Sequence, residues 1–137
     1  MKNIVFIILF FCTNIYSQNI AGKRKVISYE DEIIFYHKEK DSILFKDETR
    51  KEEVQSFKEM SELLIFPITY TFYDKGIFIM SNPNLANIEG KYKLVNEEIA
   101  KKNNDIEFQL FYFRNEVLYT KTMLLDGFVE VGLIKTN

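Results

Sequence analysis

The stretch ITYTFYDKGIFIMS (Ile68–Ser81) decides the fold class of this chain. Two runs of β-branched and aromatic residues, 68–73 and 77–81, flank the turn Asp74-Lys75-Gly76. Glycine can adopt the positive φ that a tight hairpin with a bulge requires. The stretch therefore predicts two antiparallel strands joined by a short turn, with Gly76 in the left-handed region.

The rest of the chain repeats this pattern of short strands separated by polar turns. Further strands are expected at 24–29, 32–36, 42–46, 90–95, 105–113, 116–123 and 128–135. The stretch 105–113 is apolar on both faces toward its end, which is typical of a strand that is buried on both sides. Successive strands joined by short turns predict a mainly β fold, an antiparallel meander that closes into a small barrel or forms a strongly curved sheet.

One segment, 50–65, departs from the strand pattern and contains neither Gly nor Pro. Several of its residues recur at helical spacing and share one stripe: Val54, Phe57, Met60, Ser61 and Leu64. Thr49 and Glu52 match a capping box, and Pro67 is expected to end the helix. We expect this helix to cover one face or one open end of the sheet, with a mobile lid as the alternative.

The first 17 residues have the layout of a secretory signal peptide. Lys2 supplies a positive charge, residues 4–11 form an unbroken apolar run, and Ser17 is a small residue before the expected cleavage point. The apolar run is much shorter than the roughly 20 residues that a membrane-spanning helix needs. We therefore expect a signal peptide at 1–17 and a single β domain at 18–137, with no transmembrane segment after the signal peptide is removed.

Cys12 is the single cysteine and lies inside the predicted signal peptide. The domain that follows is therefore expected to have no disulfide, no thiol nucleophile and no thiolate metal site. Phe10 and Phe11 are bulkier than the small residue expected before a lipidated cysteine, which argues against lipoprotein anchoring at Cys12. The expected location is the periplasm or the extracellular medium.

The charge balance indicates which partners to expect. Without Lys2, 17 basic residues stand against 20 acidic ones, and the two signs are mixed locally. A domain with this balance has no long-range attraction for a phosphate backbone, so nucleic acid is not an expected partner.

Residues that carry chemistry are sparse. His37 is the only histidine and adjoins a charged turn, where a solvated imidazole is the ordinary case, and one histidine without cysteine is a poor zinc site. Ser28 and Ser42 lack the Gly-x-Ser-x-Gly surroundings of an activated nucleophile, and the glycines do not form a phosphate-binding loop. We predict that the protein is not an enzyme and has no cofactor, no catalytic residue and no metal site.

Several segments resemble parts of small bacterial lipocalin-like domains of the calycin type. IAGKRKVISYE (20–30) resembles their opening strand, and TFYDKGIF (71–78) followed by GKYKL (90–94) resembles their central hairpin and the Gly-x-Tyr strand after it. NEVLY (115–119) and VGLIK (131–135) would then be the closing strands. The resemblance implies a small barrel that binds a ligand.

Arg24 marks a departure from this family. It stands where the family usually has a tryptophan that plugs one end of the barrel, and the chain contains no Trp. Because a buried unpaired guanidinium is costly, we expect Arg24 at an exposed or edge position, with pairing to a carboxylate or a differently built barrel end as the alternatives.

The abundance of aromatic residues suggests a binding function, although the same residues can simply fill the core. The predicted ligand-binding residues are strand aromatics that would line an interior cup, with one cation as an anchor for an acidic head group: Tyr70, Phe72, Tyr92, Phe108, Tyr112 and Arg114. The ligand would be small and apolar or amphipathic. The alternative is a protein-protein interaction or inhibitor module of the bacterial cell envelope with a filled core, whose partner would be an envelope protein.

Overall fold

The computed structural model describes residues 20–102, 105 and 107–136, and this part of the chain folds into a closed β-barrel. Its strands, in chain order, are β1 (Gly22–Glu30), β2 (Ile34–His37), β3 (Ser42–Phe45), β4 (Thr69–Tyr73), β5 (Ile77–Asn82), β6 (Leu85–Leu94), β7 (Gln109–Arg114), β8 (Val117–Leu124) and β9 (Gly127–Lys135). The predicted fold class, a mainly β barrel covered by a helix, is confirmed.

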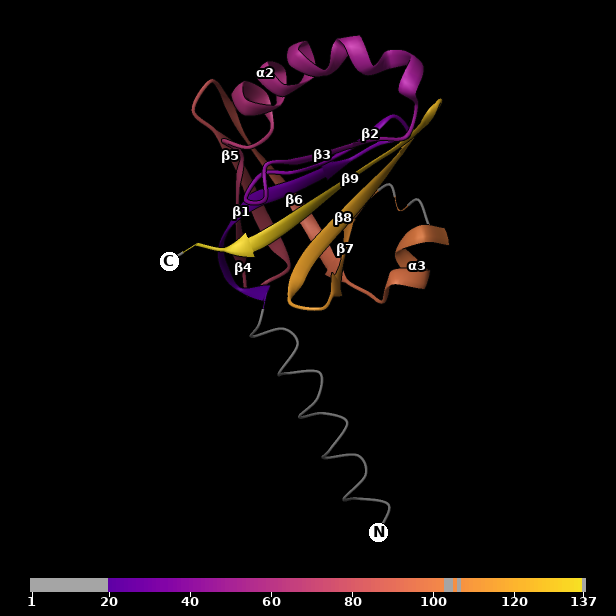
Figure 1. Ribbon diagram of the computed structural model, residues 1–137. Coiled ribbons are helices and arrows are strands. Elements are labelled where there is room, and N and C mark those ends of the chain that lie inside the picture. Colours follow the sequence, from indigo (N-terminus) through magenta and orange to yellow (C-terminus); the bar gives the residue numbers. More distant parts are fainter. Residues whose placement is uncertain (1–19, 103–104, 106, 137) are drawn as a thin grey trace.

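The barrel closes because β1 pairs with strands on both of its edges. One edge of β1 pairs with β9, from Arg24↔Lys135 to Glu30↔Glu130. The opposite edge pairs first with β4 and then with β2, so the β2–β3 hairpin extends the sheet beside the barrel wall. The seven strands of the wall follow the order β1-β4-β5-β6-β7-β8-β9, which is shown in Figure 1.

The hairpin of β4 and β5 forms as its sequence predicts. The two strands pair antiparallel up to Tyr73↔Ile77, and Gly76 has φ +77°, which confirms its predicted left-handed conformation. The backbone N–H of Tyr92 donates to the carbonyl of Gly76 at 2.9 Å, which ties the turn to β6.

One pairing differs from an antiparallel meander. Strands β6 and β7 run parallel, from Tyr92↔Gln109 to Leu94↔Phe111, and are connected through α3 (Glu97–Lys102). A parallel pair requires such a crossover, because a tight turn can join only antiparallel neighbours. Figure 1 shows α3 beside β7 and β8, on the outside of the barrel.

The predicted helix at 50–65 is present in two parts. A 3₁₀ segment, η1 (Glu48–Glu53), leads into α2 (Val54–Leu64), which lies across one end of the barrel in Figure 1. The capping residue is Asp47, whose side chain accepts from the N–H of Thr49, so the expected capping box of Thr49 with Glu52 is wrong. Aspartate fits this role because its short carboxylate can reach the first free N–H groups.

Helix α2 packs through only part of its apolar stripe. Phe57 is partly buried against the core, with its ring centroid 5.3 Å from that of Tyr29 and 6.5 Å from that of Tyr36. Ser61 is completely buried, whereas Met60 and Leu64 are 44% and 39% exposed. The helix therefore closes the barrel end with its middle and leaves apolar side chains facing solvent.

Arg24 does not have the exposed position that its sequence context predicted. It is only 3% exposed, and its guanidinium carbon lies 5.5 Å from the ring centroid of Phe113, an aromatic residue packed against the barrel core. Burial lowers the pKa of Arg24. A cation over an aromatic face recovers part of the cost of its desolvation, which explains how this position can be interior.

Candidate functional site

The barrel interior contains three of the predicted ligand-binding residues, Tyr70, Phe72 and Tyr92. The ring centroid of Phe72 lies 5.1 Å from that of Tyr92 and 5.0 Å from that of Phe111, and both pairs meet edge to face. The ring centroid of Tyr70 lies 6.1 Å from that of Phe72. These distances are those of aromatic pairs in contact, so the rings occupy the space between them.

The other three predicted residues lie on the outside of the wall. Phe108 and Tyr112 belong to a second apolar cluster with Ala100 of α3, and Arg114 pairs with Glu97 of the same helix. The six residues therefore do not face a common space. Neighbours on a strand point to opposite faces, and β7 is apolar on both, so the sequence did not reveal which set faces inward.

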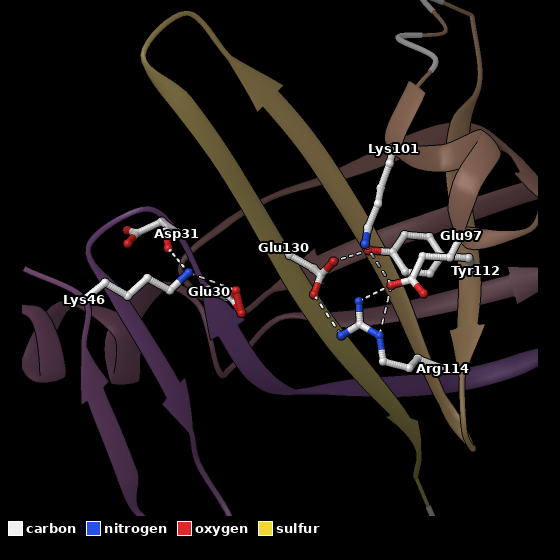
Figure 2. Close-up of polar contacts among 8 residues, drawn as sticks. All are labelled: Glu30, Asp31, Lys46, Glu97, Lys101, Tyr112, Arg114 and Glu130. Atoms are coloured by element: carbon white, nitrogen blue, oxygen red, sulfur yellow. Dashed lines mark hydrogen bonds and ion pairs between the residues drawn. The ribbon is translucent and has the colours of Figure 1, made fainter.

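A polar cluster holds α3 against the outside of the barrel (Figure 2). The hydroxyl of Tyr112 donates to a carboxylate oxygen of Glu130, and Nη1 of Arg114 lies 3.4 Å from the other oxygen. Arg114 also donates through Nε to Oε1 of Glu97 at 3.0 Å, and Lys101 lies 3.5 Å from the same oxygen. The cluster thus connects β7, β9 and α3.

The electrostatics of this cluster suit a structural role. Burial and the hydrogen bond to Glu130 raise the pKa of Tyr112, so its phenol remains a donor. The hydrogen bond from Arg114 lowers the pKa of Glu97 and keeps it an anion. Sequence reasoning missed Glu130, although a charged residue within the apolar run 128–134 was the available signal.

A groove of about 500 Å³ lies at the rim of the barrel, between the β1–β2 turn and the β8–β9 hairpin, and is called the rim groove below. Its lining is mainly apolar and includes Tyr29, Ile33, Leu124, Leu125, Phe128 and Val129. Leu124 is 55% exposed, and Leu125 at the hairpin tip is fully exposed. Consecutive apolar residues beside a turn, Met123 to Leu125, were the sequence signal for this site, which sequence reasoning missed.

Side chains of the β1–β2 turn fix one wall of the rim groove. The Asp31 carboxylate accepts from the N–H groups of Ile33 and Ile34, at 2.8 and 2.9 Å, and from the hydroxyl of Tyr29 at 3.0 Å. Burial and the Asp31 charge raise the pKa of Tyr29, which therefore remains a neutral donor. The Asp31 side chain therefore holds the turn.

The opposite wall depends on Gly127 and Phe128. A Cβ at Gly127 would lie 2.5 Å from Cδ of Glu32, so glycine allows the two walls to approach closely. The ammonium groups of Lys46 and Lys121 lie 5.0 and 4.2 Å from the ring centroid of Phe128.

Lys46 joins both walls. Its Nζ donates to Oε2 of Glu30 at 3.0 Å and to the carbonyl of Asp31 at 2.8 Å, as Figure 2 shows. Lys46 also contacts Phe128 on the opposite wall, so its side chain cross-links the two walls of the rim groove.

Two further structural findings concern the described part of the chain. Within residues 20–102, 105 and 107–136, no three His, Cys, Asp or Glu side chains are grouped so that they could hold a metal ion. The helices in those ranges include none with the length and apolar character to cross a bilayer.

Comparison with known proteins returns no relative. No protein-family model, no curated protein and no solved structure matches this chain. Inferences about function therefore rest on the fold and on the geometry of the rim groove.

Proposed function

We propose that this protein is an exported, non-catalytic, lipocalin-like binding protein that takes up a small apolar or amphipathic ligand in the rim groove. The observation that carries the proposal is the groove itself, about 500 Å³ in volume and lined mainly by apolar side chains. Sites for small molecules are typically concave, apolar and roughly 300–1,000 Å³ in volume. The barrel supplies a rigid frame on which two turns present these side chains.

The rim is a better location than the interior cup that the sequence suggested. A ligand between Tyr70, Phe72 and Tyr92 would have to displace rings that already contact one another. Protein interiors are close-packed, and separating such contacts loses their dispersion energy. The rim groove is open without any rearrangement of the core.

Two parts of the proposal rest on other features. Export rests on the charged start, apolar run and small residue within 1–17. The absence of catalysis rests on the roles of two polar groups near the groove, Asp31 and Lys46: Asp31 caps its own turn, and Lys46 links Glu30 to that turn. These groups are engaged in holding structure.

Fluorescence titration with N-phenyl-1-naphthylamine, a neutral apolar probe, tests the proposed site. Leu124→Asn should weaken binding, because it places an amide in the groove, whereas Leu85→Asn should have no effect. The control residue is a leucine of similar exposure on β6, 61% against 55% for Leu124. Binding to the wild type should also show a negative heat-capacity change in calorimetry. Failure of the probe to bind, or equal effects of the two substitutions, would contradict the proposal.

A second candidate function is an interaction module of the cell envelope that docks on another protein. It is favoured by exposed apolar side chains at the end of α2 and the start of β6: Leu63, Leu64, Leu85 and Ile88. The side chain of Asn82 donates to the carbonyl of Leu64 at 3.1 Å, which brings these two segments together. The ring-filled core is consistent with this role.

Pull-down from envelope extracts separates the two functions. An interaction module should retain a specific partner that is lost when Leu85 and Ile88 are both replaced by Asp. The Leu124→Asn variant should keep that partner. If all three proteins retain the same material, this surface is not the docking site.

A further inference from the structure

The lining of the rim groove carries charge of one sign. Three of its ten residues are acidic, Asp31, Glu32 and Asp126, and none is basic. The apolar lining and the carboxylates lie on both walls, because Asp31 and Glu32 belong to the β1–β2 turn and Asp126 to the β8–β9 turn.

Two of the three carboxylates are available to a ligand. Asp31 is engaged with backbone N–H groups and with Tyr29. Glu32 and Asp126 are exposed, and within the described part of the chain neither has a hydrogen bond or an ion pair. The carboxyl carbon of Glu32 lies close above Gly127, so this acid is positioned at the groove and does not extend away into solvent.

Among the described residues, the nearby cations form no ion pair with Glu32 or Asp126. Lys46 is bound to Glu30 and to the carbonyl of Asp31. Lys121 contacts the ring of Phe128 but lines a separate, smaller pocket of about 200 Å³ on the β7 side of the hairpin. Neither lysine lines the rim groove.

We propose that the ligand of the rim groove is a cationic amphiphile, a small molecule with an apolar body and an ammonium group. This assignment rests on the proposed binding function and adds the ligand class to it. The apolar body lies against Ile33 and Leu124, and the ammonium group faces Glu32 and Asp126. Charge complementarity selects this class over fatty acids, because a carboxylate ligand would meet two unpaired carboxylates.

Three probes with the same ten-carbon chain test the assignment: decylamine, decanol and decanoate. Each is titrated calorimetrically below its micelle-forming concentration, at low and at high salt. Decylamine should bind about 1.5- to fivefold more tightly than decanoate, the range expected for a solvent-exposed charge pair. Added salt should narrow this difference because it screens exposed charges.

A pair of double variants isolates the carboxylates. Glu32→Gln with Asp126→Asn should abolish the preference for decylamine over decanoate. Glu89→Gln with Glu116→Gln removes the same net charge at exposed positions outside the groove lining and should keep the preference. Unfolding midpoints of both variants check that they remain folded.

The outcomes distinguish failure of the proposed binding function from failure of the cationic ligand class. If none of the three probes binds, both the proposed binding function and the ligand class are overturned. If decanol binds but decylamine has no advantage over decanoate, or if the two double variants behave alike, only the cationic ligand class is overturned.

Discussion

Adjacent residues of β7 are buried on opposite faces of the barrel wall. Phe111 and Tyr112 are both completely buried. Phe111 lies among rings inside the barrel, within 5.0–6.2 Å of four other aromatic centroids. Tyr112 lies outside, under α3, where its hydroxyl reaches Glu130. Closure of the barrel buries the inner face, whereas the outer face needs a separate cover.

The two faces of β7 are held by different kinds of contact. The inner face is held mainly by hydrocarbon and ring contacts, because the closed wall excludes water. The cover of the outer face is a short helix, and its ion pair with Arg114 ties it to the strand that it covers. Interior residues should therefore contribute most to the free energy of unfolding. The contribution of the outer cluster should depend on its charges and on pH.

The largest expected effect is on the inner face. Phe111→Ala should lower the free energy of unfolding by about 3–5 kcal/mol, through lost transfer energy and the cavity left behind. Denaturant unfolding monitored by circular dichroism measures the change. Leu125→Ala, at a fully exposed position, is the control and should change stability by no more than about 0.5 kcal/mol. Similar midpoints for the two variants would show that the interior is not the main source of stability.

An alkaline titration probes the inner face at Tyr70. Burial raises its pKa from 10.0 to about 12, so the folded state favours the neutral phenol. The neutral phenol of Tyr70 therefore contributes about 2–3 kcal/mol to the free energy of unfolding below pH 10, and this contribution is lost as the pH rises toward 12. Tyr70→Phe, which has no such proton, should lose less stability over this range than the wild type, and Tyr73→Phe, at a residue that is 48% exposed, is the control. Parallel pH curves for all three proteins would contradict the burial of the phenol.

The outer face is tested by Tyr112→Phe. The substitution keeps the ring but removes a hydrogen bond to the buried Glu130, at an expected cost of about 1–3 kcal/mol. A double-mutant cycle with Glu130→Gln should show coupling between the two positions. Strict additivity in the cycle would mean that the hydroxyl and the carboxylate act independently.

The smallest expected effect is at the ion pair between Glu97 of α3 and Arg114. Glu97→Gln should cost no more than about 1 kcal/mol, because the ion pair with Arg114 is partly exposed. Arg114 lowers the pKa of Glu97 from 4.5, so the contribution is present above pH 4.5 and is lost as the pH falls through the lowered pKa. Glu98→Gln on the same helix is the control. Equal stabilities of these two variants at pH 7 would show that the ion pair between Glu97 and Arg114 does not stabilise the protein.

Local patterns predicted most of the secondary structure. The hairpin around Gly76, the strands of the barrel and the helical segment near 50–65 follow from turn chemistry and apolar periodicity, which act over a few residues. The sequence predicted a strand at 90–95, whereas β6 already begins at Leu85, directly after the tight turn at Pro83-Asn84.

Features that depend on distant pairing could not be predicted in the same way. The parallel β6–β7 pair requires knowing that α3 crosses between them, and α3 is only six residues long. The burial of Arg24 depends on Phe113, far along the chain. The rim groove is formed by two turns about 95 residues apart, and nothing local to either turn indicates the other.

The β1–β9 pairing has a consequence for how the chain reaches its native state. The strand that completes the wall occupies Gly127–Lys135, and its partner begins at Gly22, so the wall cannot be complete until nearly the whole chain is available. Contacts of such long sequence separation slow folding, because loop closure costs entropy before the contacts form. Until then β1 and β8 each present an unpaired edge that can recruit another chain, so loss of β9 would turn a closed barrel into a template for aggregation.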